Sequence, residues 1–131
     1  MKNTSKKEIV RATLDSLCFQ TLDLIKAMEK DSKIKIFEMK VDGGMVHNNN
    51  FLQTLSNVLQ IKINKPKNVE TTSLGAAYLA ALECGYIKNI EEINKNWKSK
   101  KIYKNKITKK IIDKEINVWK KTIEKIIKLY S

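Results

Sequence analysis

Apolar side chains recur every three or four residues along the first thirty positions of the chain. This spacing predicts one long helix with an apolar stripe. The segment Ser5-Lys6-Lys7-Glu8 has the form of a capping box, so the helix is expected to begin there. Its end is expected near Asp31-Ser32. The stripe comprises Leu14, Leu17, Thr21, Ile25 and Met28, with Cys18 and Leu22 beside it.

Two short segments rich in strand-forming residues follow. Residues 34–41 are apolar on both faces by their end, which predicts an interior strand that stops at Asp42-Gly43-Gly44. A second short strand is expected at residues 61–63, closed by the chain's only proline, Pro66. Between the two strands, apolar positions up to Leu59 predict a helix, capped by an asparagine of the cluster at residues 48–50.

An alanine-rich segment at residues 70–82 predicts a third helix, with hydroxyl residues before it as caps and Gly85 as its natural stop. The small side chains of this helix would let it pack very close to its neighbours. These small residues are Gly75, Ala76, Ala77, Ala80 and Ala81. Residues 89–105 are polar and rich in lysine, with Trp97 among them, and are expected to form a surface connection with a short helix.

From about Thr108 onward, apolar residues recur at alternating steps of three and four, with lysines on the other face. The pattern predicts a long amphipathic helix. Such a helix could lie on a membrane surface, but docking on its own domain is the commoner cause and the favoured interpretation. The segments together alternate helix, strand, helix, strand, helix and terminal helix, which indicates an α/β layered domain.

The composition fits one domain, or part of one, because the chain has 131 residues of which 42% are hydrophobic and 31% charged. No run approaches the roughly 18 apolar residues of a membrane-spanning helix, and the amino terminus has no signal-like apolar stretch, so no membrane partner and a cytoplasmic location are expected. Cys18 and Cys84 lie in apolar helical segments without metal-ligand spacing. We therefore predict two buried, reduced thiols.

The formal net charge of +12 raises the question of nucleic-acid binding. Among the 26 basic residues only Arg11 is an arginine, although the guanidinium group is favoured for bidentate recognition of phosphate and guanine. The lysines are also spread along the whole sequence. A solvated lysine surface is therefore the favoured interpretation, and nucleic-acid binding is its alternative.

The segment Val41-Asp42-Gly43-Gly44-Met45-Val46-His47-Asn48 carries the candidate chemistry. Two glycines directly after a strand let the backbone turn sharply and let a ligand approach the main chain. Ligands of α/β sheets bind at strand ends. The Asn48 amide can both donate and accept, which suits the edge of an adenine ring. Taken alone, the pair of glycines is weak evidence, because a plain tight turn is its commoner explanation.

Two segments together are more specific than the loop alone. VDGGMVHNNNFLQTLSNVL and KPKNVETTSLGAAYLAALECG, in this order and at this separation, resemble the closing portion of glycerol kinases in the FGGY carbohydrate kinase family. The opening IVRATLDSLCFQTLDLIKAMEKDS is similar to the family's preceding helix, and Trp119-Lys120-Lys121 is similar to its terminal Trp-Lys-Lys. The resemblance extends from about Ile9 to the last helix and weakens between residues 89 and 116.

This resemblance implies a fold and a set of binding residues. The α/β fold would be the carboxy-terminal part of a ribonuclease-H-like, actin- or hexokinase-type ATPase domain, ending in the long amphipathic helix. Residues 1–131 would be the carboxy-terminal part of the adenine-binding domain, with the amino-terminal domain absent. The implied nucleotide-binding residues are Gly43, Gly44 and Asn48. Asp42 would fix the loop rather than act as a base, and His47 is interpreted as loop surface rather than as a general acid or metal ligand.

The resemblance also implies an activity for a complete enzyme, which would use ATP and Mg²⁺ to convert glycerol to glycerol 3-phosphate. This chain has no GxxxxGK[ST] loop and no acidic cluster, so the catalytic and Mg²⁺ sites are expected outside it, and the chain alone is predicted to be inactive. The implied partners are ATP, glycerol, the amino-terminal portion of the kinase and further copies in a homo-oligomer. Three alternatives remain: a pentose or other polyol kinase, an inactive relic of a split gene, and a basic nucleic-acid-binding module.

Overall fold

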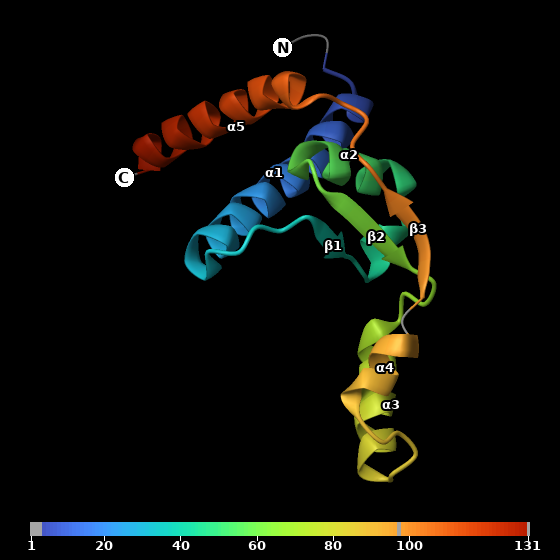
Figure 1. The fold of residues 1–131 in the computed structure, drawn as a ribbon. Helices are drawn as coiled ribbons and strands as arrows, with labels where there is room; N and C mark the ends of the chain where they lie inside the picture. The colour runs from blue at the N-terminus through green and yellow to red at the C-terminus, as the bar shows by residue number, and fades with distance from the viewer. Residues whose placement is uncertain (1–3, 97, 131) are drawn as a thin grey trace.

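A computed structural model describes residues 4–96 and 98–130, and Trp97 lies outside these described residues. Figure 1 shows a mixed α/β body from which α3 and α4 project as an arm. None of the described helices is long and apolar enough to cross a membrane. The elements in chain order are α1 (Lys6–Ser32), β1 (Glu38–Lys40), the 3₁₀ helix η1 (Gly44–His47), α2 (Asn49–Leu59), β2 (Lys62–Pro66), α3 (Thr71–Glu83), α4 (Ile90–Asn96), β3 (Ser99–Tyr103) and α5 (Lys109–Tyr130).

Helix α1 has the boundaries that its local sequence predicts. The backbone N–H of Ser5 donates to Glu8 Oε2 at 2.6 Å, which confirms the capping box. The helix ends before Lys33, which takes the left-handed conformation with φ of 58°. The predicted stripe is only partly buried. Cys18, Leu22 and Ile25 enter the core, Leu14 and Thr21 are half-buried, and Leu17 and Met28 are exposed.

The sheet has the order β1-β2-β3, with β1 parallel and β3 antiparallel to β2. Met39 of β1 and Tyr103 of β3 both pair with Ile63 of the central strand. The prediction of an interior strand at residues 34–41 is wrong, because only Glu38–Lys40 form a strand and this strand lies at the sheet edge. The short helix predicted within residues 89–105 is confirmed by α4, but the rest of this segment is not a surface connection alone, because it contains β3.

The hydrophobic core lies between α1, α2 and the sheet. Helix α2 contributes the largest share, and Val46, Ile63 and Tyr103 extend the core through η1, β2 and β3. The buried Ser56 hydroxyl donates to the carbonyl oxygens of Ile61 and Tyr103 at 2.8 and 3.2 Å, and thereby ties α2 to the sheet. The buried hydrophobic residues are Cys18, Leu22, Ile25, Val46, Leu52, Leu55, Val58, Leu59, Ile63, Tyr103, Ile112 and Ile116.

Helix α5 docks on the body by its first half. Ile112 and Ile116 are buried, and the Trp119 ring stacks on Phe19 with 5.5 Å between the ring centroids. Trp119 Nε1 also donates to Asp23 Oδ2 at 3.1 Å. The predicted docking is confirmed for this half only, because the apolar residues near the end of the helix are exposed.

Helix α3 differs from its prediction in three respects. It begins at Thr71 after Glu70, so the hydroxyl residues lie inside the helix and not at its cap. It has no buried residue, and a Cβ added at Gly75 would meet nothing within 4 Å among the described atoms, so the expected close packing is not made within the described chain. Cys84 after α3 is exposed, which contradicts its predicted burial, whereas the predicted burial of Cys18 is confirmed.

Candidate functional site

The candidate site begins where β1 ends. The N–H of Val41 donates to Asn64 O at 3.2 Å, so the chain stays beside β2 for one more residue before it turns. Gly43 then adopts φ of 80° and ψ of −176°, a region of backbone conformation that is essentially restricted to glycine. The prediction that Gly43 supports a sharp turn is therefore confirmed, since this residue supplies the turn's special backbone geometry.

The chain after the turn is held in place by a buried side chain and by local hydrogen bonds. Val46 is buried and anchors η1 in the core. The N–H of Val46 donates to Gly43 O at 3.2 Å, and the N–H of Asn48 donates to Met45 O at 3.1 Å. Asn48 Oδ1 accepts a hydrogen bond from the N–H of Phe51 at 3.0 Å, so the predicted asparagine cap of α2 is confirmed.

The opposite wall of the site comes from the segment after β2. Because β1 and β2 are parallel, their carboxyl ends lie side by side, and the residues that follow the two strands emerge at the same end of the sheet. Thr71, the first residue of α3, donates a hydrogen bond from its hydroxyl group to Asp42 Oδ2, which joins the two walls, as expected for a residue that fixes the loop. A cavity of about 230 Å³ lies between the walls and is lined by Asp42, Gly43, Gly44, His47, Val69, Glu70, Thr71 and Thr72.

The charges around this cavity favour an uncharged ligand group over a phosphate. The carboxylates of Asp42 and Glu70 both line it, and no lysine or arginine does so among the described residues. Backbone N–H groups at the start of a helix attract anions, but Glu70 immediately before α3 offsets that attraction at this end. The lining is mostly polar, with hydroxyl groups and two glycines where a ligand could contact the main chain.

The three nucleotide-binding residues predicted from the sequence do not all meet in the cavity. Gly43 and Gly44 line it, whereas Asn48 does not and uses its side-chain oxygen to cap α2. His47 is exposed, as predicted for loop surface, but it also lines the cavity.

The opposite wall was not assigned to the site from the sequence. Its residues belong to the second segment that carries the family resemblance, but that resemblance implies no nucleotide-binding role for them. The parallel pairing of β1 and β2 is the signal that could have revealed this wall, because it places the residues after Pro66 beside the Asp-Gly-Gly loop.

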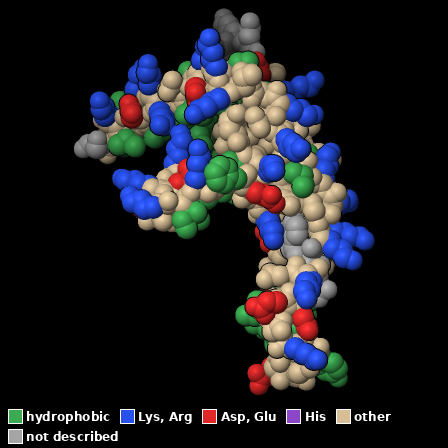
Figure 2. Space-filling view, in the orientation of Figure 1, with side chains coloured by type: hydrophobic (Ala, Val, Ile, Leu, Met, Phe, Trp, Pro, Cys, Tyr) green, Lys and Arg blue, Asp and Glu red, His purple; other side chains and the backbone are tan. Residues whose placement is uncertain are grey.

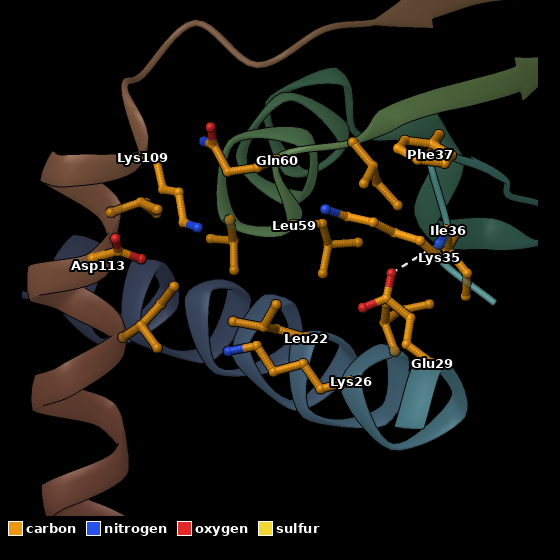
Figure 3. A pocket seen from close by; sticks show the side chains of 15 residues that line it. Leu22, Lys26, Glu29, Lys35, Ile36, Phe37, Leu59, Gln60, Lys109 and Asp113 are labelled. Atoms are coloured by element: carbon orange, nitrogen blue, oxygen red, sulfur yellow. Dashed lines mark hydrogen bonds between the residues drawn. The ribbon is translucent and has the colours of Figure 1, made fainter. Parts of the chain in front are cut away.

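A second cavity, of about 550 Å³, lies among α1, the segment before β1, the end of α2 and the start of α5 (Figure 3). Its floor is apolar and includes Leu22 and Leu59, and Lys26, Lys35 and Lys109 extend around it from three different elements. Glu29 Oε1 accepts a hydrogen bond from the N–H of Ile36 at 2.8 Å, so this carboxylate is part of the scaffold. The second cavity is lined by none of the predicted nucleotide-binding residues, so the first cavity is the candidate functional site.

The remaining candidate chemistry of the described residues is sparse. No group of three or more His, Cys, Asp or Glu side chains is placed to hold a metal ion within the described chain. Burial raises the pKa of the Cys18 thiol to about 12, which suits a core residue and not a nucleophile. Lysine side chains are spread over the visible face of the molecule (Figure 2), as expected for a solvated surface.

The cavity and both of its walls lie in a segment with a recognised family signature. The model of the C-terminal domain of the FGGY family of carbohydrate kinases matches residues 1–84, which include β1, η1, α2, β2 and α3. The chain belongs to the FGGY family of carbohydrate kinases. The elements α4, β3 and α5 of this FGGY chain follow the matched residues.

Relatives of the FGGY chain include named glycerol kinases. It is 39% identical over 127 residues to the glycerol kinase of Thermoanaerobacter sp. (strain X514), covering 97% of this chain and 26% of the relative. It is 41% identical over 124 residues to the glycerol kinase of Clostridium botulinum (strain Hall), covering 95% of this chain and 25% of the relative. The chain therefore spans about a quarter of the length of the curated relatives it matches.

Solved structures agree with the family assignment. The crystal structure of Plasmodium falciparum glycerol kinase with ADP matches with a TM-score of 0.83 and 31% identity, over 95% of this chain and 25% of that chain. The ligand-bound xylulose kinase of Lactobacillus acidophilus matches with a TM-score of 0.70 over 98% of this chain and 25% of that chain, at 20% identity. At that identity the second likeness shows the fold alone.

Proposed function

We propose that residues 1–131 are the carboxy-terminal part of the adenine-binding domain of a glycerol kinase, with the ribonuclease-H-like fold of actin- and hexokinase-type ATPases. The complete enzyme transfers the γ-phosphate of ATP to a hydroxyl of glycerol and gives glycerol 3-phosphate. The observation that carries the proposal is the cavity between the Asp42–Gly44 loop and the start of α3, in a chain about 40% identical to glycerol kinases.

Glycerol is favoured over a pentose as the substrate of the complete enzyme. Among the solved structures, the Plasmodium falciparum glycerol kinase is 31% identical to this chain and the xylulose kinase is 20% identical, and the curated relatives at 39% and 41% identity are named glycerol kinases. The residues that would contact the polyol belong to the part of the kinase outside this chain. The cytoplasmic location, the homo-oligomer and the Mg²⁺ site outside the chain stay expectations from the family resemblance.

Within the complete enzyme, this segment binds adenosine. Gly43 shapes the turn, and Gly44 presents a wall without a Cβ against which a flat base can lie. Asn48 Oδ1 accepts a hydrogen bond from the N–H of Phe51. The Asn48 side chain can therefore bind a ligand by donating a hydrogen bond from its Nδ2 group. The carboxylates of Asp42 and Glu70 disfavour phosphate in the cavity, which supports binding of the uncharged part of the nucleotide here and of the phosphates elsewhere.

The contribution to catalysis is positional. Binding energy gained from adenosine holds the phosphates in register with groups supplied by the rest of the enzyme. The transfer requires a carboxylate to accept the proton of the attacking hydroxyl and Mg²⁺ to neutralise the γ-phosphate. The described residues of this chain include no cluster of side chains that could hold a metal ion. The chain alone therefore binds part of a substrate but performs no transfer.

The proposal is tested by glycerol-dependent ATP consumption. The chain is assayed alone and together with the amino-terminal three-quarters of the Thermoanaerobacter glycerol kinase, the part that precedes the matched region. We expect turnover only in the mixture, and turnover with glycerol in preference to xylulose. A folded and associated mixture that consumes no ATP would contradict the proposal and favour the inactive relic.

A further inference from the structure

The second cavity lies at the opposite end of the two parallel strands from the candidate site. Phe37, just before β1, and Ile61, just before β2, line it, whereas residues that follow these two strands line the candidate site. The two cavities share no lining residue. The volume of about 550 Å³ is within the range of about 300–1,000 Å³ that is typical of pockets for small molecules. A ligand in the second cavity would therefore leave the candidate site free.

The floor of the second cavity is part of the hydrophobic core. Six of its apolar side chains are buried and come from α1, α2 and α5, so the packing of three helices fixes the floor. An apolar chain or ring placed on this floor would leave water and contact all three helices. The apolar lining residues are Leu22, Ile25, Ile36, Phe37, Val58, Leu59, Ile61, Ile112 and Ile116.

Two polar side chains of the walls are already hydrogen-bonded and hold the cavity in shape. Glu29 Oε1 accepts a hydrogen bond from the N–H of Ile36 at 2.8 Å, which joins α1 to the segment before β1. Gln60 Nε2 donates to the carbonyl oxygen of Ile107 at 3.0 Å, which joins the end of α2 to the segment before α5. The cavity is therefore formed before any ligand arrives, and this preorganisation lowers the cost of binding.

Three lysines surround the apolar floor. Lys26 comes from α1, Lys35 from the segment before β1 and Lys109 from the start of α5. Figure 3 shows the amino ends of Lys35 and Lys109 extending toward the middle of the cavity from opposite sides. Among the described residues, none of these three lysines forms an ion pair. The carboxylates of Glu29 and Asp113 also line the cavity, which leaves one excess positive charge around it.

We propose that the second cavity binds a small amphipathic anion, that is, an apolar chain or ring that carries a single anionic group. The apolar part covers the floor beside Leu22 and Leu59, and the anionic group lies between the amino groups of Lys35 and Lys109. Removal of the apolar part from water supplies most of the affinity, and the lysines select the sign of the ligand's charge. The inference does not rest on the proposed function, because it uses no residue of the candidate site.

A groove at another face of α5 offers an internal comparison. It has a volume of about 430 Å³, lies between α1 and α5 and is lined by the stacked rings of Phe19 and Trp119. The charged side chains that line it among the described residues are the carboxylates of Asp15 and Glu115. Arg11 forms an ion pair with Asp15, so the excess charge at this groove is negative. An amphipathic anion should therefore choose the second cavity over this groove.

The first test is titration of this full chain with octanoate, hexanoate and octylamine, followed by NMR signals of backbone amides. Octanoate should shift the amide signals of Lys35 and Ile61 at the second cavity, and leave those of Ser16 and Val118 at the groove unchanged. Octanoate should bind about tenfold more tightly than hexanoate, because it buries two further methylene groups. Octylamine has the same chain but a positive charge, so it should not shift the signals of Lys35 and Ile61.

The second test reverses two of the lysine charges. The variant is Lys35→Glu with Lys109→Glu, and the matched control is Lys110→Glu with Lys120→Glu, because Lys110 and Lys120 do not line the cavity. All four lysines are exposed, so circular dichroism should show an unchanged fold for both variants. We expect the variant to weaken octanoate binding at least about tenfold, because two positive charges beside the ligand become negative. The control should bind octanoate as the natural chain does.

Four results would overturn the inference. The first is octanoate binding of natural strength in Lys35→Glu with Lys109→Glu, and the second is an equal loss in the control. The third is a shift of the Lys35 and Ile61 signals by octylamine as large as the shift by octanoate. The fourth is an octanoate titration that moves neither of these two signals.

Discussion

Thr71 Oγ1 donates a hydrogen bond to Asp42 Oδ2, and this bond joins two segments that are 29 residues apart in the sequence. Asp42 follows β1 and Thr71 begins α3, so the bond holds the two walls of the candidate cavity at a fixed separation. Its acceptor is a carboxylate, which makes the hydrogen bond stronger than one between neutral groups.

Thr71→Val is expected to loosen the cavity without unfolding the chain. An exposed hydrogen bond of this kind contributes about 1 kcal/mol, so ATP binding to the assembled kinase should weaken roughly fivefold. Thr72→Val is the matched control, because Thr72 lines the same cavity beside Thr71 but has no side-chain hydrogen bond to Asp42 in the structure. Calorimetric titration with ATP measures both. Equal effects of the two substitutions would show that the Thr71–Asp42 bond is not what fixes the site.

The two glycines of the loop should respond differently to substitution by alanine. Gly43→Ala forces a side chain into a glycine conformation and should lower the free energy of unfolding by about 1–3 kcal/mol. Gly44 does not have a positive φ, and a Cβ added to it would meet nothing within 4 Å. Gly44→Ala should therefore leave the free energy of unfolding unchanged. Urea denaturation compares the two, and a Gly44→Ala chain as unstable as Gly43→Ala would contradict this assignment of the turn.

The two roles of Asn48 can be separated by two substitutions. Asn48→Ala removes the cap of α2 and should cost about 1 kcal/mol of stability, whereas Asn48→Asp keeps the acceptor for the N–H of Phe51. Asn48→Asp also removes the Nδ2 donor, so it should weaken ATP binding while keeping stability. Thermal denaturation and ATP titration are the two measurements. Natural ATP affinity in Asn48→Asp would exclude Asn48 from the nucleotide site.

The two cysteines should differ sharply in reactivity. Burial raises the pKa of the Cys18 thiol to about 12, and Cys84 is exposed, so a thiol reagent at pH 8 should modify one cysteine per chain quickly. Cys84→Ser should abolish the fast reaction.

The folded-state pKa of Cys18 lies above its ordinary value of 9.0, so the unfolded chain loses this proton first. Cys18 should therefore contribute a fall in stability as pH rises from about 9 to about 12, and the fall should be smaller in Cys18→Ala than in the natural chain.

Much of the fold could be predicted because it depends on local chemistry. The capping box at Ser5, the end of α1 at Ser32 and the asparagine cap of α2 each involve residues within a few positions of one another. The Asp-Gly-Gly turn was predictable for the same reason, since its glycine conformation is a property of the loop itself.

Features that depend on distant partners were not predictable in this way. Strand β3 is held by its pairing with β2 and buries only Tyr103, so its own sequence resembles a lysine-rich surface segment. The docking of α5 does not reach Ile126 and Ile127, because no described element covers the last part of its apolar face. The exposure of β1 and of Cys84 likewise depends on what surrounds them and not on their local pattern.

The central claim is that this chain supplies the adenosine wall of a glycerol kinase, and steady-state kinetics of the assembled enzyme with Gly44→Val tests it most directly. The β-branched side chain projects from the loop that lines the cavity, so it should raise the KM for ATP at least about tenfold and leave the KM for glycerol unchanged. An unchanged KM for ATP in a folded Gly44→Val enzyme would contradict the claim.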